Sequence, residues 1–445
     1  MKNSKVFIWS ISVALGGFLF GFDTAVISGA EKSIQVLWKL DALQHGFTIS
    51  IALIGTVIGA IFGGIPSDAL GRKKTLLLIA ALYLLSAVGT AFAFDWYSFL
   101  VFRFLGGLGV GASSVTAPMY ISEIAPPTQR GKLVGLFQFN IVFGILISYL
   151  SNYLFAQAAL GEDTWRWMLG IQALPSALFL FALLYVPESP RWLIVKQNKL
   201  DEARRILQIS ASEDEVNQEI AEILATKQEN QTKDVEPFFS AKYFTPISLA
   251  FLFAMFNQLS GINAIIYYAP RIFEMTGLGK ESALLSSAGI GLVNFTFTLL
   301  ALQVIDKFGR KTLMLIGSVG LIVTLGLVAR AFYVEDFKGY AVPAYLFVYI
   351  AFFAFSQGAV IWVFISEIFP NQVRAKGQAL GSSTHWVMAA LIAFTFPMIA
   401  EKLGGGHTFL IFTVMMVLQL LFVWRMMPET KNTSLEQLGN KMIVH

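Results

Sequence analysis

The chain has 445 residues, of which 56% are hydrophobic and only 13% are charged. This composition excludes a soluble globular protein of this length and indicates a helical protein that crosses a membrane many times. The absence of cysteine excludes disulfides and thiolate metal sites. The net charge of +4 does not indicate a nucleic acid partner, because the basic residues cluster in short connections and act there as topology signals.

The first apolar run follows Lys2 and Lys5, an arrangement that resembles the start of a secretory signal. However, Asp23 lies in the middle of this run, and the run continues to Gly29 without interruption. We therefore predict a first membrane span rather than a cleaved leader.

Twelve apolar segments follow one another along the chain, each close to the twenty residues that a bilayer requires. The predicted spans are 7–29, 47–66, 75–94, 98–121, 132–156, 165–186, 247–275, 283–305, 312–333, 343–369, 376–400 and 407–427. Basic residues concentrate on alternate connections, namely at Arg72, Lys73, Lys74, Arg130, Lys132, Arg191, Lys307, Arg310, Lys311, Arg374 and Lys376. By the positive-inside rule, this side and both termini are cytoplasmic.

The interval 187–246 is the one long polar segment. Its helical periodicity with many exposed charges predicts short amphipathic cytoplasmic helices, and it is too short for a regulatory or catalytic domain. We expect it to pack under the membrane domain and to couple two bundles. The predicted organisation is an N-terminal six-helix bundle (1–186), this helical linker (187–246), and a C-terminal six-helix bundle with a short tail (247–445).

Three motifs occur twice, at a spacing of about 240 residues that indicates an internal duplication. ISEIAPPTQRGKLVG (121–135) returns as ISEIFPNQVRAKGQA (365–379), DALGRKK (68–74) as DKFGRK (306–311), and PES (187–189) as PET (428–430). Parallel six-helix halves with a binding site between them are a recurring design of secondary transporters.

The seventh predicted span carries an unusual group of polar side chains without formal charge: Asn257, Gln258, Ser260, Asn263, Tyr267 and Tyr268. Most of them share one face of a helix, and Gln258 joins that face only if the helix bends, for which Gly261 and Pro270 offer places. Amides at membrane depth need a partner or a water-filled cavity, and uncharged donors and acceptors suit a neutral ligand rich in hydroxyls. The alternative is hydrogen bonding between helices.

Acidic and basic side chains of the repeated motifs are expected to form a cytoplasmic gating network. Its members are Asp68, Arg72, Glu123, Arg130, Glu188, Asp306, Arg310, Glu367 and Arg374. We expect ion pairs that include Glu123 with Arg130 and Glu367 with Arg374, and that hold the two halves together in one state and part in the other. The alternative is that the cations only set topology and the acids neutralise them.

Several further motifs accompany these: GFDTAVISG (21–29), RFLGGLGVG (103–111), PMYISEIAP (118–126), PESPRWL (187–193) and QLSGINAIIYYAP (258–270). Together with the two GRK motifs, RGKLVG (130–135) and PET (428–430), they resemble the sugar porter family of the major facilitator superfamily, closest in pattern to bacterial proton-coupled xylose and hexose symporters. The resemblance implies an all-α membrane protein of twelve helices in two pseudo-symmetric bundles. It also implies alternating-access transport of monosaccharides.

Asp23 is the candidate proton site, since a carboxylate at membrane depth is costly and needs a partner. Arg103 is the only basic residue deep in the same half. Drying the site or losing the arginine favours the protonated acid, which is the physical basis of proton coupling. Proton symporters of the family resemble this chain in carrying Asp at this place, whereas facilitative relatives carry Asn. The alternative is a static buried ion pair.

The resemblance also implies a set of sugar contacts: Gln138, Asn257, Gln258, Asn263, Tyr267, Asn294, Trp362, His385, Trp386 and Phe20. Amides both donate and accept, as hydroxyls do, and the indole of Trp362 offers an apolar face to a sugar ring. Three positions depart from the family pattern. Asn257 replaces a usual Gln, His385 replaces Asn or Gln, and Ile145 makes the pocket more apolar, which leaves the sugar open.

The sequence predicts a proton-coupled monosaccharide importer in a cytoplasmic (inner) membrane, acting as a monomer in the lipid bilayer. Neither enzymatic activity, nor a cofactor, nor a metal is expected, and no nucleotide-binding loop is present. A facilitative uniporter and a sugar sensor are alternatives; known sensors carry long tails, while this chain ends about fifteen residues after its last predicted span.

Overall fold

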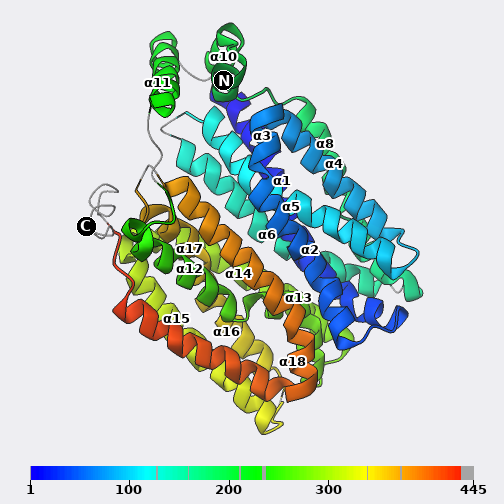
Figure 1. The fold of residues 1–445 in the computed structure, drawn as a ribbon. Helices are drawn as coiled ribbons and strands as arrows, with labels where there is room; N and C mark the ends of the chain where they lie inside the picture. Colours follow the sequence, from blue (N-terminus) through cyan, green and yellow to red (C-terminus); the bar gives the residue numbers. More distant parts are fainter. Residues whose placement is uncertain are drawn as a thin grey trace. The chain divides into compact units, whose positions relative to one another are not determined.

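The structure is a computed structural model that describes residues 2–126, 129–158, 160–209, 212–232, 237–337, 339–370 and 373–431. Within these ranges the chain is helical and forms no strand (Figure 1). Among the described residues, eleven helical segments are long and apolar enough to cross a membrane, and the last of them is long enough to hold two of the predicted spans. The expected all-α architecture is therefore confirmed.

In the first half of the sequence the spans are α1 (Lys2–Leu37), α2 (Ala42–Phe62), α4 (Arg72–Ala91), α5 (Trp96–Ile124), α6 (Arg130–Gln157) and a sixth made of η1 (Gly161–Asp163), α7 (Thr164–Gly170) and α8 (Ala173–Leu184). In the second half they are α12 (Phe244–Leu259) with α13 (Ile262–Met275), α14 (Lys280–Phe308), α15 (Arg310–Tyr333), α16 (Ala341–Phe355) with α17 (Gln357–Glu367), and α18 (Arg374–Arg425). Short helices are α3 (Gly64–Leu70), α9 (Pro190–Trp192), η2 (Leu193–Gln197), α10 (Leu200–Leu207), α11 (Glu213–Thr232) and η3 (Ala241–Tyr243).

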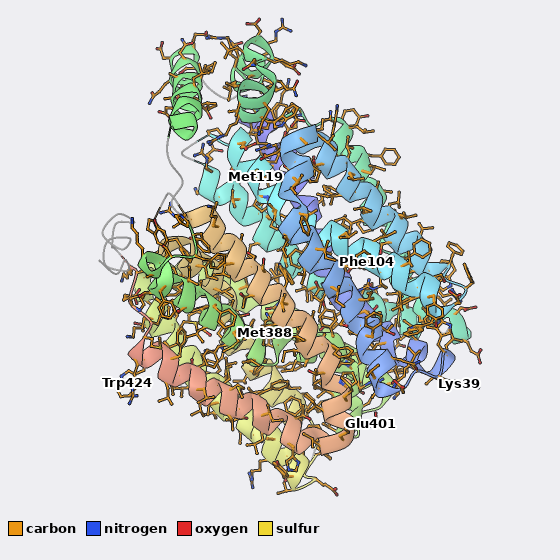
Figure 2. All side chains as sticks on the ribbon, viewed as in Figure 1. Lys39, Phe104, Met119, Met388, Glu401 and Trp424 are labelled. Atoms are coloured by element: carbon orange, nitrogen blue, oxygen red, sulfur yellow. The ribbon has the colours of Figure 1, made fainter. Side chains whose placement is uncertain are left out.

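Local chemistry sets several of these boundaries. Asp95 caps α5, because its carboxylate accepts from the Ser98 backbone N–H at 2.7 Å, and this bond lowers the pKa of Asp95. The long α18 bends at Gly404, whose φ of +77° is costly for other residues. Glu401 lies just before the bend, and Trp424 lies near the far end of the second part (Figure 2). The bend explains how one helix supplies both the eleventh and the twelfth predicted spans.

Two compact units can be distinguished by their internal packing. The first comprises Met1–Asp23, Gly55–Ile145 and Leu169–Glu236; the second comprises Thr24–Ile54, Leu146–Met168 and Pro237–His445. Parts of α1, α2 and α6 therefore pack with helices from the second half of the sequence. Since these units are defined by packing alone, the bundles predicted from the repeat (1–186 and 247–445) stay a prediction.

The core of each unit is apolar and aromatic. In the first unit, Leu19, Tyr83 and Phe179 are fully buried within one cluster from α1, α4 and α8. In the second unit, the rings of Phe253 and Phe364 stack with centroids 5.0 Å apart, which joins α12 to α17.

The polar interval contains short amphipathic helices, as expected. One face of α9, η2, α10 and α11 buries a small core of Trp192, Leu193, Ile194, Ala203, Leu207, Val216, Ile220 and Ile223. The Trp192 indole N–H donates to the Asp68 carbonyl at 2.8 Å, which ties the linker to α3. On α11, burial raises the pKa of Glu219, and the charge of Arg130 opposes that rise. The coupling of two bundles by this linker stays a prediction.

Candidate functional site

The seventh span is broken at the two places that the sequence suggests. Gly261 adopts φ +83° between α12 and α13, a left-handed conformation that glycine tolerates best. Within α13, Tyr268 leaves helical geometry with φ −118° and ψ 19°, two residues before Pro270. Both predicted bends are confirmed. The breaks re-aim the polar side chains of this span relative to an unbroken helix.

Two tyrosine hydroxyls satisfy carbonyls that prolines leave without a helical donor. Pro270 has no N–H for the Ile266 carbonyl, and the Tyr149 hydroxyl of α6 donates to that carbonyl at 2.6 Å. In the same way Pro397 has no N–H for the Ala393 carbonyl, and the Tyr268 hydroxyl donates there at 3.0 Å. A broken helix thus keeps its backbone paired in an apolar setting.

A chain of amides runs across the break. Asn263 Nδ2 donates to Gln258 Oε1 at 2.7 Å, and Gln258 Nε2 donates to Asn257 Oδ1 at 3.0 Å. Asn257 Nδ2 in turn donates to the Gln357 carbonyl, at 3.3 Å, where α16 and α17 meet. Gln258 Nε2 also lies 3.2 Å from both ring nitrogens of His385 on α18. The three amides are buried, and their orientations depend on one another.

Two indoles flank the end of this chain. The Trp362 ring lies 5.0 Å from the His385 ring, centroid to centroid, and the Trp386 ring lies 4.9 Å from it. Trp362 is 37% exposed, whereas Trp386 is only 6% exposed. The expected contacts Asn257, Gln258, Asn263, Trp362, His385 and Trp386 are therefore brought together in one connected group.

The other expected sugar contacts are divided between the two units. Tyr267 and Asn294 are buried in the second unit, on α13 and α14. Gln138 and Phe20 are half-buried and belong to the first unit, on α6 and α1. Their part in a sugar site stays a prediction.

Asp23 and Arg103 form an ion pair within the first unit. Arg103 Nη1 of α5 donates to Asp23 Oδ1 of α1 at 2.7 Å, and the two side chains are 2% and 4% exposed. Arg103 Nε and Nη2 are buried and find no hydrogen-bond partner among the residues that the structure describes. The predicted pairing is confirmed, and its role in proton coupling stays a prediction.

The two copies of the basic motif build matching ion-pair networks, one in each unit. Arg72 pairs with Glu123, from Nε at 3.0 Å, and with Asp68 at 3.0 Å. Arg310 pairs with Glu367 at 2.8 Å and with Asp306 at 2.9 Å. Each network joins the end of one helix to the start of another within its own unit. The duplication inferred from sequence is thus visible in side-chain geometry.

The pairing of the acids corrects one expectation. Glu123 pairs with Arg72 rather than with Arg130, and Glu367 pairs with Arg310 rather than with Arg374. Arg374 Nε donates instead to the Phe369 carbonyl at 3.3 Å. The reason is that Arg72 and Arg310 are the first residues of α4 and α15, and these helices pack beside the helix ends that carry Glu123 and Glu367.

The PES and PET motifs complete these networks. Glu188 accepts from the backbone N–H groups of Arg72 and Lys73, at 2.9 and 3.1 Å, and so caps the start of α4. Glu429 does the same for α15, and the hydroxyls of Ser189 and Thr430 donate to Glu123 and Glu367. Of these residues, only Glu188 was predicted from the sequence. The repeated PES and PET motifs were the available signal for Ser189, Glu429 and Thr430.

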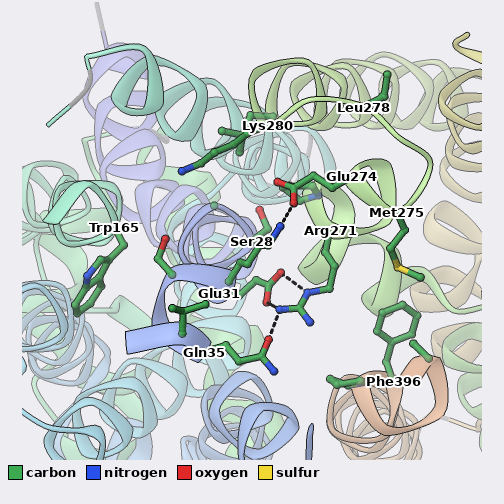
Figure 3. A pocket seen from close by; sticks show the side chains of 18 of the residues that line it. Ser28, Glu31, Gln35, Trp165, Arg271, Glu274, Met275, Leu278, Lys280 and Phe396 are labelled. Atoms are coloured by element: carbon green, nitrogen blue, oxygen red, sulfur yellow. Dashed lines mark hydrogen bonds and ion pairs between the residues drawn. The ribbon is translucent and has the colours of Figure 1, made fainter. Parts of the chain in front are cut away.

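A further charged cluster, formed by Glu31, Arg271 and His45, was not predicted from the sequence. Glu31 on α1 pairs with Arg271 on α13 at 2.7 Å, beside a cavity of about 1140 Å³ in the second unit (Figure 3). Glu31 also pairs with His45 on α2 at 2.7 Å. The available signal was the occurrence of charged residues next to the apolar runs, at Glu31 and in the APRIF segment (269–273).

The chain is similar in sequence and in structure to known transport proteins. A family profile described as "Sugar (and other) transporter" matches residues 9–441. An arabinose-proton symporter of Bacillus subtilis (strain 168) is 37% identical over 437 residues, which cover 97% of this chain and 94% of the relative. A D-xylose-proton symporter of Escherichia coli (strain K12) is 36% identical over 475 residues, covering 98% and 96%. The inward-open structure of the xylose transporter XylE from E. coli superimposes with a TM-score of 0.87 at 35% identity, covering 98% of this chain and 99% of that one.

Proposed function

Because this chain belongs to the sugar transporter family of the major facilitator superfamily, we propose that it imports a monosaccharide together with a proton by alternating access. The observation that carries the proposal is the buried pair of Asp23 and Arg103, joined at 2.7 Å. Relatives named as arabinose-proton and D-xylose-proton symporters match over nearly their whole length and support proton coupling.

Asp23 is the proposed proton site. In a dry setting an ionised carboxylate is stable only beside its cation, and protonation lets the acid exist without that cation. Arg103 donates to the Asp23 carboxylate in the pair, and we propose that a proton taken up by Asp23 releases the arginine. Two states of one pair give the transporter a means of linking proton occupancy to conformation.

The connected amides and indoles are the proposed sugar site. Gln258, Asn263 and His385 present both donors and acceptors, which match the hydroxyls of a neutral sugar. The half-exposed face of Trp362 suits the C–H face of a pyranose ring. Gln138, Tyr267, Asn294 and Phe20 are proposed to complete the site in the transport cycle. Hexoses and pentoses both fit this chemistry.

The remaining roles follow from the same proposal. The matching networks around Arg72 and Arg310 are proposed to gate the cytoplasmic side. Both termini are proposed to lie on that side, a proposal supported by the basic residues of its connections. The protein is proposed to act as a monomer in a bacterial inner membrane. Neither nucleic acid nor a catalysed reaction has a part in it.

The test is uptake of labelled monosaccharides into proteoliposomes, with and without an inward proton gradient, for the natural protein and Asp23→Asn. The proposal predicts accumulation that depends on the gradient in the natural protein, and only downhill exchange in Asp23→Asn. Equilibration that ignores the gradient would assign a facilitative uniporter in which Asp23 is structural. A folded protein that binds sugar but moves none would assign a sensor.

A further inference from the structure

The cluster around Glu31 takes no part in the sites proposed above. Glu31 is 1% exposed, and its carboxylate accepts from Arg271 Nε at 2.9 Å and from Arg271 Nη2 at 2.7 Å. Arg271 also donates to Gln35 (Figure 3). His45 Nε2 lies 2.7 Å from Glu31 Oε2. One carboxylate thus ties α1 to α2 and to α13.

The charges of this cluster balance only when no extra proton is present. Glu31 and Arg271 cancel each other, and a neutral His45 adds nothing. The forked guanidinium contact is strong because it makes two parallel charge-assisted hydrogen bonds. His45 Nδ1 is buried and has no hydrogen-bond partner in the described part of the chain, so an added proton there would be unsatisfied. A proton on Glu31 or on His45 leaves one net positive charge on the cluster, in which both of these side chains are buried.

Several other titratable groups lie around the cluster. Tyr268 of α13 faces His45 with ring centroids 5.9 Å apart, but its hydroxyl donates to the Ala393 carbonyl. Lys32, the residue after Glu31, pairs with Glu274, which lies about one turn beyond Arg271 on α13. The remaining charged residues that line the same cavity come from other elements, and they are Glu162, Lys280 and Glu401.

The position of the cluster matters because α13 is the broken half of the seventh span. Its kink at Tyr268 lies three residues before Arg271 and is the point at which we expect the segment that carries Arg271 to turn. The cluster sits at the end of α1 that is far from Lys2, on the side opposite to the basic connections. By the proposed orientation, this is the outer side.

We propose that Glu31, Arg271 and His45 form a proton-sensitive outer latch, which holds α13 against α1 and α2 and must part whenever the transporter opens outward. Acid outside favours release, because the protonated cluster is charged and gains solvation when water reaches it. The inference rests on the proposed alternating-access function and orientation. It gives protons a second point of action besides Asp23.

The absence of native cysteine allows a direct test. Ser28 is 3% exposed and lines the same cavity, so Ser28→Cys reports whether the cavity has opened. A membrane-impermeant maleimide is applied to right-side-out and inside-out vesicles that contain Ser28→Cys alone or with Glu31→Gln. The matched control is Glu401→Gln, which removes the same charge from the same cavity without touching the latch. Tyr340→Cys, at an exposed site, corrects for the effect of pH on the reagent.

We expect Glu31→Gln to raise the rate of outside labelling at position 28 by about tenfold or more, the effect of losing a charged hydrogen bond. Glu401→Gln leaves the rate unchanged. In Ser28→Cys itself, the corrected rate rises as the outer pH falls from about 8 to about 5. In Glu31→Gln the rate is high throughout, since glutamine already leaves Arg271 unbalanced. If Glu31→Gln expresses poorly, Arg271→Gln takes its place. This variant removes the α13 partner of Glu31, and we expect the same increase.

Three outcomes would overturn the inference. The first is equal labelling of Glu31→Gln, Glu401→Gln and the parent. The second is a pH response that survives in Glu31→Gln. The third is the loss of the pH response when Asp23→Asn is added to Ser28→Cys and Glu31 is unchanged. That outcome would assign the pH response to Asp23. Labelling of position 28 only in inside-out vesicles would instead contradict the orientation, and so the proposed function.

Discussion

Arg103 donates a single hydrogen bond of 2.7 Å to Asp23, although both residues are almost fully buried. The Nε and Nη2 groups of Arg103 have no partner within the described residues. A buried ion pair stabilises a fold only when its remaining hydrogen bonds are also made, so this pair is a poor device for stability. Its retention in an apolar span favours a role in function.

The pair predicts that the stability lost in Arg103→Gln is largely restored when Asp23→Asn is added. Arg103→Gln leaves the Asp23 carboxylate buried without a cation and should lower the free energy of unfolding by about 3 to 5 kcal/mol. Asp23→Asn removes that charge, so the double variant should regain most of the loss. Thermal unfolding in detergent of both single variants and of the double variant measures this. A double variant whose loss equals the sum of the two single losses would show that the two side chains act independently.

Much of this arrangement could be predicted from the sequence, for identifiable reasons. The spans follow from apolar runs, and the breaks follow from Gly261 and Pro270, whose backbone limits are intrinsic to those residues. The pairing of Asp23 with Arg103 follows from the cost of isolated charges at membrane depth. These are properties of single residues in a known environment.

Partners that depend on how helices approach one another were harder to predict. Glu123 pairs with Arg72, 51 positions away in sequence, rather than with the nearer Arg130. The capping of α15 by Glu429 and the contact of Glu31 with Arg271 likewise join distant segments. No local periodicity specifies such contacts, because they depend on the packing of whole helices.

The amide chain predicts unequal effects of two adjacent substitutions on sugar binding. Gln258 contacts Asn263, Asn257 and His385, whereas Asn257 donates to the Gln357 backbone. Gln258→Ala should therefore weaken binding by about tenfold or more, since it leaves several buried groups unpaired, while Asn257→Ala should weaken it less. Isothermal titration of detergent-solubilised protein with the transported sugar measures both. Equal losses would place Asn257 in direct contact with the sugar.

The break in the seventh span predicts a costly substitution with a close control. Gly261 and Gly277 have nearly the same positive φ, +83° and +86°. A Cβ on Gly261 would lie 2.6 Å from the Phe412 ring, whereas a Cβ on Gly277 would meet nothing within 4 Å. Alanine at either position should cost about 1 to 2 kcal/mol for its backbone conformation.

Only Gly261→Ala adds the steric clash, so it should have the lower Tm of the two variants and a lower rate of transport. Scanning fluorimetry and sugar counterflow in proteoliposomes measure the difference. If Gly277→Ala loses as much stability as Gly261→Ala, the contact with Phe412 is not what makes glycine necessary at position 261.

The cap at the start of α15 predicts a stability that depends on pH. The Glu429 carboxylate accepts four backbone N–H groups at 2.9 to 3.0 Å, those of Arg310, Lys311, Thr430 and Lys431. Partial burial raises the pKa of Glu429, but the four hydrogen bonds outweigh it and hold the pKa below the ordinary value of 4.5. The folded state therefore binds this proton less readily than the unfolded state.

It follows that Glu429 contributes its full stabilisation above about pH 4.5 and loses it as the pH falls through the lowered folded value. Glu429→Gln should thus have a lower Tm than the natural protein at neutral pH, and the two Tm values should converge toward pH 4 and below. Glu401→Gln, which removes an exposed carboxylate, should show no such convergence. The contrary outcome is a Tm difference between Glu429→Gln and the natural protein that stays constant down to the lowest pH at which both remain folded. It would mean that the charge of Glu429 is not what stabilises the start of α15.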